Sequence, residues 1–275
     1  PIIGATTFDE FKGSYHGLGK TFPGVCTPFG LVQLSPDTKT GGDNGSGYSW
    51  HHKTIEGFSF THMSGVGWYG DLGNFLVMPT TGTLKTFKGT EEEPESGYRS
   101  RYSHEREQAS AHKYTVMLDD YQIQAELAAA PRSGIIRFTY PKSDTSRIQI
   151  DPARRIGGSS TEQYVEVVDN HTIKGWMKCT PNTGGWGDGQ GKADYTVYFH
   201  CCFDKPLKNF GVWSADIPDE ADRKNASNDN PAYFEYIKNA KVLPMQKSAQ
   251  GKHLGFYTEF PTEEGEQVLL KCGIS

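Results

Sequence analysis

The sequence lacks long apolar runs, clusters of basic residues and helical periodicity. No apolar run reaches the ~20 residues that a membrane-spanning helix needs, so no such helix is expected. The formal net charge is -5, from 28 basic and 33 acidic residues, and no stripe of Lys or Arg is present that could follow a phosphate backbone. A nucleic-acid partner is therefore not expected. The scarcity of apolar residues at a 3.6-residue period argues against a helix bundle.

Cysteines are few, and none forms a CxxC pair. The five are Cys26, Cys179, Cys201, Cys202 and Cys272. Their spacing argues against a structural zinc site, and their number is too small for a disulfide-dense scaffold. Because free cysteine is among the most buried residue types, we expect most of them to be buried thiols, and the redox compartment stays open.

The 275 residues include 32 glycines and only 35% hydrophobic residues, which is typical of many short strands joined by loops. Turn residues separate the strand-like segments, and several segments alternate apolar and polar residues. We predict a single all-β domain over residues 1–275, an antiparallel β-sandwich. The predicted strands are Gly30–Ser35, Ile55–Thr61, Asn74–Pro79, Gly82–Phe87, Tyr98–Ser103, His112–Leu118, Ile123–Ala128, Ser133–Tyr140, Arg147–Asp151, Tyr164–Val168, Thr172–Cys179, Asp194–Cys202, His253–Glu259 and Glu266–Cys272.

The alternation stops in residues 214–250, where Asn, Asp, Lys and Ala dominate. Asn230 followed by Pro231 predicts the N-cap and first position of a short amphipathic helix that buries Phe234, Ile237 and Val242. We interpret residues 214–250 as an insertion between two strands.

Several polar clusters are poor catalytic candidates. The glutamates of residues 91–95 surround a proline and are typical of a solvated loop. Asp119 and Asp120 lie between strand-like segments and predict a hairpin turn. His51 and His52 have no third metal ligand at a familiar spacing, which favours a surface turn.

The stretch FSFTHMSGVGWYGDLGN, residues 58–74, begins as a half-buried strand over Phe58–Thr61 and then becomes a glycine-rich loop. Trp68 and Tyr69 lie in that loop. An aromatic face packs against the C–H face of a sugar, whereas loop amides, His and Asp satisfy its hydroxyl groups. The residues alone leave two interpretations open, a sugar-binding platform and a cap on the sandwich core. A second glycine-rich loop, Thr180–Asp194, carries Trp186 and is either a mobile surface loop or a lip of the same site.

Four ordered stretches resemble the N-terminal domain of glycoside hydrolase family 92, the calcium-dependent exo-α-mannosidases. They are KTFPGVCTPFGLVQLSPDT from Lys20, SGYSW from Ser46, TIEGFSFTHMSGVGWYGDLGNFLVMPTTG from Thr54 and YTVMLDDYQIQAELAAAPRSGIIRFTYP from Tyr114. The chain departs from the family pattern at Phe60, where His is frequent, and at Ala129, where Thr is expected. The first departure weakens any role for a histidine at that position.

The resemblance implies a β-supersandwich, of the galactose-mutarotase type, that precedes an (α/α)6 helical domain. It places the catalytic acid, the catalytic base and the calcium ligands on that helical domain, so it implies no catalytic or metal-binding residue in this chain and no cofactor of its own. It implies that the loop after His62 reaches a mannose-containing oligosaccharide. The residues expected to contact the substrate are Trp68, Tyr69, His62, Gly67, Asp71 and Phe22, with Trp68 at the leaving-group subsite of α-1,2-specific members.

Three functions follow as hypotheses. The first is the N-terminal domain of an inverting exo-α-mannosidase, inactive without the helical domain; the second is a free-standing carbohydrate-binding module; the third is a structural support domain. The resemblance also implies a periplasmic or secreted protein whose leader precedes Pro1.

Overall fold

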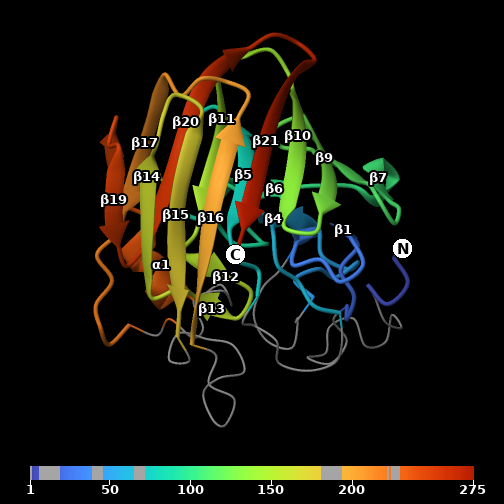
Figure 1. Ribbon diagram of the computed structural model, residues 1–275, viewed down its shortest axis with the longest axis horizontal. Helices are drawn as coiled ribbons and strands as arrows, with labels where there is room; N and C mark the ends of the chain where they lie inside the picture. Colours follow the sequence, from blue (N-terminus) through green and yellow to red (C-terminus); the bar gives the residue numbers. More distant parts are fainter. Residues whose placement is uncertain are drawn as a thin grey trace.

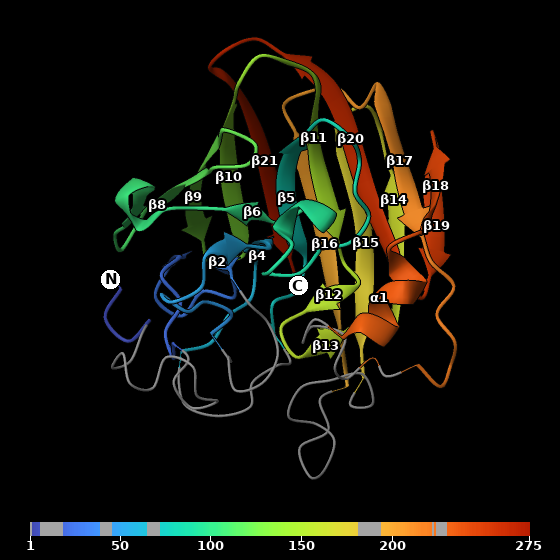
Figure 2. The ribbon, with the colours of Figure 1, turned by 180° about the vertical axis from the view of Figure 1, so that it is seen from behind.

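The computed structural model describes residues 2–5, 19–38, 46–64, 72–180, 194–221, 223 and 230–275. These residues form a sandwich of antiparallel β-sheets, which confirms the predicted all-β fold (Figures 1 and 2). None of the helices in these ranges is long and apolar enough to cross a membrane.

The first layer of the sandwich contains eight strands within the described ranges. In spatial order they are β1 (Val25–Cys26), β2 (Gln33–Asp37), β4 (Gly57–Ser59), β5 (Leu76–Thr81), β11 (Ser143–Asp151), β20 (Leu254–Thr262), β17 (Asn209–Ser214) and β18 (Lys241–Pro244). Because β5 pairs with β11 and β11 with β20, this sheet joins distant parts of the chain.

The second layer contains nine strands among the described residues. In spatial order they are β19 (Ser248–Gly251), β14 (Glu162–Val167), β15 (Thr172–Cys179), β16 (Tyr195–Phe203), β21 (Glu266–Ile274), β10 (Ser133–Tyr140), β9 (Ile123–Ala130), β8 (Tyr114–Leu118) and β7 (Glu107–Ala109). Short pairs lie outside the two layers: β3 (Thr54–Ile55) with β6 (Ser100–Arg101), and β12 (Arg154–Arg155) with β13 (Gly158–Ser159). The 3-10 helices Pro94–Ser96 and His104–Arg106 connect strands.

Alternating apolar residues place one face of each long strand in the core between the layers. In β10, for example, Ile136, Phe138 and Tyr140 are buried, whereas Ile135, which faces the other side, is 38% exposed. Aromatic rings from both layers meet in this core, as in the pair Phe58 and Phe138, whose ring centroids are 6.4 Å apart.

Residues 214–250 contain more regular structure than predicted. The helix α1 (Pro231–Ile237) begins as expected, with the side chain of Asn230 accepting a hydrogen bond from the amide of Ala232 at 3.1 Å. Val242 does not belong to this helix, so that part of the prediction was wrong: it lies in β18 and is 38% exposed. The strands β18 and β19 that follow are the edge strands of the two layers, where polar and exposed side chains hide the alternation.

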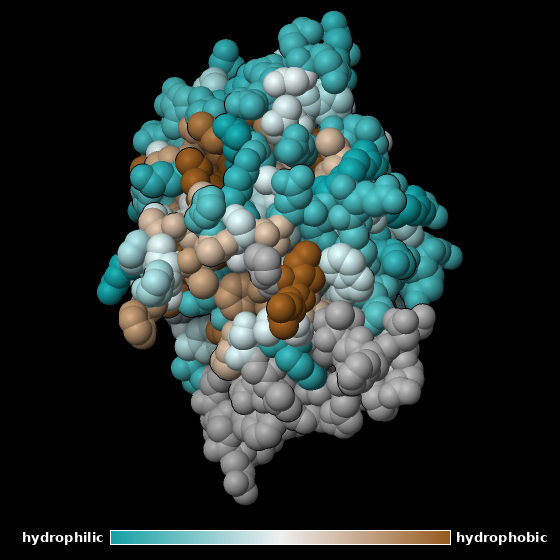
Figure 3. All heavy atoms as spheres, turned by 90° about the vertical axis from the view of Figure 1, so that its right-hand side faces the viewer, coloured by the Kyte–Doolittle hydropathy of each residue, from teal (hydrophilic) through white to brown (hydrophobic). Residues whose placement is uncertain are grey.

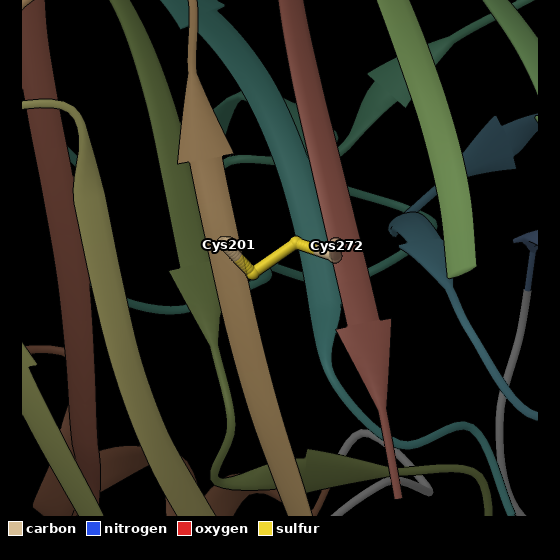
Figure 4. The surroundings of a disulfide bond; sticks show 2 residues. All are labelled: Cys201 and Cys272. Atoms are coloured by element: carbon tan, nitrogen blue, oxygen red, sulfur yellow. A yellow bond between two sulfur atoms is a disulfide. The ribbon is translucent and has the colours of Figure 1, made fainter. Parts of the chain in front are cut away.

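The prediction that most cysteines are buried thiols was wrong. Cys201 on β16 and Cys272 on β21 are directly opposite in register, with Cα atoms 4.2 Å apart, and form a disulfide (Figure 4). Cys26 and Cys202 are exposed thiols, and Cys179 is a buried one. The pairing could not be expected from sequence spacing because it depends on which strands become neighbours.

Candidate functional site

The candidate site is the end of the sandwich where the stretch from Phe58 to Asn74 leaves and re-enters the sheet. Of the six residues expected to contact substrate, His62 and Phe22 are described by the structure. The other four, Trp68, Tyr69, Gly67 and Asp71, lie outside the described residues, as does most of the second glycine-rich loop. Their roles stay predictions, and the residues that flank them form the described part of the site.

The strand that enters this loop is buried on both sides. Phe58 and Phe60 enter the core as the alternation predicts, but Ser59 and Thr61 are also buried, at 0% and 6% exposure. The expectation of a half-buried strand was therefore wrong. Its polar face does not meet water, because it packs against a cluster of buried polar and charged side chains.

His62 belongs to this cluster and is 3% exposed. Its Nδ1 lies 2.6 Å from the carbonyl oxygen of Gln33, and its Nε2 lies 2.8 Å from Oδ1 of Asp37. Both ring nitrogens thus lie within hydrogen-bonding distance of an oxygen atom of the protein. The ring of Phe22 lies over this region, with its centroid 5.5 Å from that of His62.

Ser59, His62 and Asp37 form a trio whose residue types match a serine-hydrolase triad, but the geometry differs from one. The Nε2 atom of His62 lies close to both the Ser59 hydroxyl, at 3.1 Å, and the Asp37 carboxylate. The Ser59 hydroxyl donates directly to Oδ2 of Asp37 at 2.5 Å. Because the imidazole does not stand between the hydroxyl and the carboxylate, it cannot relay a proton from Ser59 as a triad does.

Beneath His62, buried ion pairs connect Asp37 to Glu56. Arg154 bridges the two carboxylates, with Nη1 2.7 Å from Oδ2 of Asp37 and Nη2 2.9 Å from Oε2 of Glu56. The other oxygen of Glu56 accepts from Lys88 and Arg99, each at 2.9 Å. We call Asp37, Glu56, Lys88, Arg99 and Arg154 the charge cluster.

The charge cluster holds the carboxylate of Glu56 ionised. Burial alone would raise the pKa of Glu56, but Lys88, Arg154 and Arg99 outweigh it and lower this pKa to about 2. Burial likewise opposes the charge on Arg154, yet Asp37 and Glu56 raise its pKa above the ordinary value. A general acid at neutral pH needs a raised pKa, so Glu56 is unsuited to that role.

The cluster fixes the two ends of the loop that carries Trp68. The amide of Gly73 donates to the carbonyl of Thr61 at 2.8 Å, and the Thr61 hydroxyl donates to Oδ1 of Asn74 at 2.7 Å. Nη1 of Arg154 lies 3.4 Å from the Gly73 carbonyl. Gly73 has φ +82°, and a Cβ there would lie 2.5 Å from Cγ1 of Ile156, so only glycine fits this position without strain.

Residues that flank the other glycine-rich loop reach the same place. Nδ2 of Asn74 lies 3.2 Å from the hydroxyl of Tyr195, two residues after that loop's last undescribed position. Thr38 and Gly47, on either side of a third undescribed stretch, are joined by a backbone hydrogen bond of 2.8 Å. The described ends of three separate loops therefore meet around Asp37, His62 and Asn74.

The other polar residues considered in the sequence occupy structural positions. The glutamates of residues 91–95 and the turn at Asp119 and Asp120 lie where predicted, in a loop and between β8 and β9. The expected surface turn at His52 was wrong: His52 is 8% exposed and its Nδ1 lies 2.8 Å from the Thr38 hydroxyl. Within the ranges that the structure describes, no three His, Cys, Asp or Glu side chains come together as metal ligands.

Sequence reasoning did not single out Asp37, Glu56, Arg154, Asn74 or Tyr195. The only pattern near Glu56 is a charged residue among apolar ones, in Ile55–Glu56–Gly57–Phe58. Alternation of this kind predicts that the charged residue faces solvent. Their common burial depends on contacts such as that between Asp37 and Arg154, which are 117 residues apart.

Comparison with known proteins points to one family. The family model described as the glycosyl hydrolase family 92 N-terminal domain matches residues 1–275. A family GH92 α-mannosidase from Bacteroides thetaiotaomicron, solved in complex with mannoimidazole, is 37% identical with a TM-score of 0.76, over 94% of this chain and 30% of that chain. A family GH92 inverting mannosidase from Bacteroides thetaiotaomicron VPI-5482 is 22% identical with a TM-score of 0.69, over 99% of this chain and 30% of that chain, and shows likeness of fold. Curated protein sequences give no match. The chain thus spans about a third of the length of these solved relatives.

Proposed function

The chain belongs to the glycosyl hydrolase family 92 N-terminal domains, and from this we propose that it forms one wall of the active site of an exo-α-mannosidase. The observation that carries the proposal is the convergence of three loop bases on one rigid, buried cluster. A wall that contacts a sugar must hold its loops in place before the sugar arrives, because ordering them on binding costs free energy. The charge cluster and the hydrogen bonds at Gly73 and Asn74 provide that preorganisation.

The proposed substrate is an α-linked mannose at the non-reducing end of an N-glycan or mannan. One relative is named an α-mannosidase and was solved with mannoimidazole, which supports the sugar class. We propose α-1,2 linkages, with Trp68 facing the leaving-group sugar together with Tyr69, Gly67 and Asp71. Phe22 and His62 lie next to each other, and since both ring nitrogens of His62 already lie close to oxygen atoms of the protein, the proposed part of His62 is to position the loop that follows it.

We propose hydrolysis by single displacement with inversion, in which an acid and a base act on opposite sides of the glycosidic bond. Both groups, and the ligands of a calcium ion that binds the mannose, would lie on a following (α/α)6 domain. The described residues offer no matching ligand cluster, so no step is assigned here to calcium. The role of this chain is to bind and orient the sugar and to exclude water from one side.

We also propose a periplasmic or secreted location. The disulfide between Cys201 and Cys272 supports it, because such bonds persist in oxidising compartments and are rare in the cytosol.

The decisive experiment assays the longer polypeptide that contains this chain on α-1,2-, α-1,3- and α-1,6-mannobiose, with calcium and with a chelator. We expect calcium-dependent release of mannose, fastest from the α-1,2 disaccharide, with the β-anomer appearing first in the NMR spectrum. Initial release of the α-anomer would contradict inversion, and no release from any α-mannoside would contradict the proposed function.

The contribution of this chain is tested by Trp68→Ala in the same polypeptide. We expect a higher KM and lower activity on α-1,2-mannobiose. The control is the same variant on an aryl α-mannoside, which has no second sugar and should lose less. Unchanged kinetics on the disaccharide would show that Trp68 does not contact the leaving-group sugar.

A further inference from the structure

Phe29 is the most exposed large apolar side chain of the described residues, with a relative exposure of 108%. It lies in the turn between β1 and β2 and has φ +59°, a left-handed backbone conformation that bulky residues rarely adopt. Strain of this kind persists where the surroundings impose it, and it is found at functional positions more often than elsewhere. Here the ring gains no burial in return.

The turn around Phe29 is held in place by hydrogen bonds. The amide of Gly30 donates to the carbonyl of Thr27 at 3.0 Å, and Nε2 of Gln33 donates to the Gly30 carbonyl at 2.7 Å. The amide of Leu31 donates to the carbonyl of Pro131 in the turn between β9 and β10, at 2.7 Å. The turn is therefore attached to both layers of the sandwich, which holds the backbone of Phe29 in place and its ring in solvent.

Two further apolar side chains accompany Phe29. Leu31 is 43% exposed and Met63 is 38% exposed. Gln33 connects the two segments that carry them. Its backbone amide donates to the carbonyl of Phe60, and its backbone carbonyl lies close to Nδ1 of His62, the residue before Met63. We call Phe29, Leu31 and Met63 the Phe29 patch. Figure 3, which looks at the side of the sandwich where β1 lies, shows apolar residues gathered among hydrophilic ones on this side.

The end of the chain lies between β16 and the turn that joins β9 to β10, and Ser275 exchanges backbone hydrogen bonds with Tyr198 of β16. Gly273 pairs with Ser133 at the start of β10, and the amide of Ile274 donates to the carbonyl of Arg132 at 3.2 Å. Arg132 directly follows Pro131, whose carbonyl accepts a hydrogen bond from the amide of Leu31. Polypeptide that continues beyond Ser275 would thus leave the domain one strand away from the turn that binds Leu31, and the solved relatives are about three times as long as this chain.

We propose that the Phe29 patch is the docking surface for the polypeptide that follows Ser275, with the Phe29 ring inserted into an apolar pocket of that segment. This inference rests on the proposed function only in requiring a longer chain. An aromatic ring carries a large apolar area and loses few rotamers on burial, so a rigid exposed phenylalanine suits such an anchor. It would also fix the following segment next to the loop bases that meet at His62.

Hydroxyl-radical footprinting of the longer polypeptide tests the proposal without any substitution. Tyr236 and Met245, exposed by 41% and 53%, serve as internal references for Phe29 and Met63. We expect Phe29 and Met63 to be modified about fivefold more slowly than the references of their kind, as in a water-excluding contact. Modification as fast as that of Tyr236 and Met245 would overturn the proposal. Protection that disappears on dilution would also overturn it, in favour of a second copy of the chain.

A pair of matched variants tests the contact energetically. Phe29→Gly removes the ring at a backbone angle that glycine adopts readily, so the fold is retained; Met245→Gly makes the same change at φ +55° on an exposed residue of the β18–β19 turn. In the longer polypeptide, Phe29→Gly should raise the rate of proteolytic cleavage after residue 275 about tenfold, and Met245→Gly should not. Equal rates for the two variants would contradict docking.

Mannose release measured on the same samples separates the two proposals. A protected Phe29 patch in a polypeptide that cleaves no α-mannoside would leave the docking surface standing and remove the proposed function. Mannose release from a polypeptide whose Phe29 patch is unprotected would support the proposed function and remove the docking surface.

Discussion

Glu56 carries a full negative charge in the interior because three cations surround it. Its side chain is wholly buried, and Lys88, Arg99 and Arg154 each lie 2.9 Å from one of its oxygens. A buried ion pair adds little net stability over an apolar replacement, but the loss of one partner leaves the others uncompensated. The charge cluster therefore acts mainly by fixing positions.

The first prediction follows from this asymmetry. Glu56→Gln should lower the free energy of unfolding by about 3 kcal/mol, because Lys88 and Arg99 then lose the buried carboxylate that they pair with, and Arg154 keeps only Asp37. Denaturation by urea measures the change. Glu95→Gln is the matched control: Glu95 also pairs with an arginine, Arg101, but its side chain is 66% exposed, so we expect less than about 0.5 kcal/mol. Equal effects of the two substitutions would show that burial of the Glu56 charge is unimportant.

The second prediction concerns pH. The pKa of Glu56 falls from an ordinary 4.5 in the unfolded chain to about 2 in the folded one, so its ionisation stabilises the fold fully above pH 4.5 and progressively less as the pH falls toward 2. The difference in free energy of unfolding between the wild-type chain and Glu56→Gln should therefore shrink between pH 5 and pH 3. Because the other carboxylates are the same in both proteins, their contributions to the free energy of unfolding cancel in this difference. A difference that stays constant over this range would contradict the lowered pKa.

At the scale of elements, sequence patterns predicted strands best where one face is buried and the other exposed. The bounds of β10 and β15 match the predicted ones, because buried side chains alternate with more exposed ones along most of each strand. The segment Gly82–Phe87 was wrongly predicted as a strand: Gly82 has φ +79°, and Phe87 packs against Phe234 of α1 instead of joining a layer.

The candidate site was predicted less well than the strands, because it depends on contacts between residues that are far apart in the sequence. The pattern from Phe58 located the strand and the start of the loop, but not that Ser59 and Thr61 are buried. Their burial depends on Asp37, 22 residues before Ser59, and on Arg154, which reaches that carboxylate from far along the chain. Pairing between distant segments is invisible to a local pattern, and the same holds for the disulfide between β16 and β21.

The third prediction concerns that disulfide, which joins strands separated by 71 residues in the sequence. In the chain-entropy description, closing a loop of this length stabilises the fold by about 4 kcal/mol. Replacing Cys201 and Cys272 together by alanine should lower the free energy of unfolding by an amount of this order. Cys202→Ala, next to the bond but exposed, should change it little.

Counting thiols provides a separate check on the pairing. Alkylation of the unfolded, unreduced chain should label Cys26, Cys179 and Cys202, and reduction should add the other two. Five labels without reduction would show that the bond does not form.

At the scale of the whole molecule, the sandwich presents one end as a prepared surface. The loop bases around Asp37, His62 and Asn74 are rigidly held, yet the carboxylates among the charge cluster are neutralised by cations and available neither as acid nor as base. Such an end suits the proposed wall, which binds and orients a sugar while the proposed acid and base lie on a following domain. This proposed division of labour would distinguish a half-site from a self-contained carbohydrate-binding module.

The fourth prediction tests that division. The 275-residue chain alone should release no mannose from α-1,2-mannobiose with calcium present, because the acid and base that cleavage needs are proposed to lie on another domain. It should also bind the disaccharide with a Kd well above the micromolar range in calorimetry, since half of the contacts are missing.

Adding the remainder of the polypeptide, produced separately, should restore mannose release if the Phe29 patch brings the two parts together. Phe29→Gly should weaken that restoration and Met245→Gly should not. Mannose release by the 275-residue chain alone would place the catalytic groups within it, and micromolar binding would identify a complete binding site and favour the carbohydrate-binding module instead.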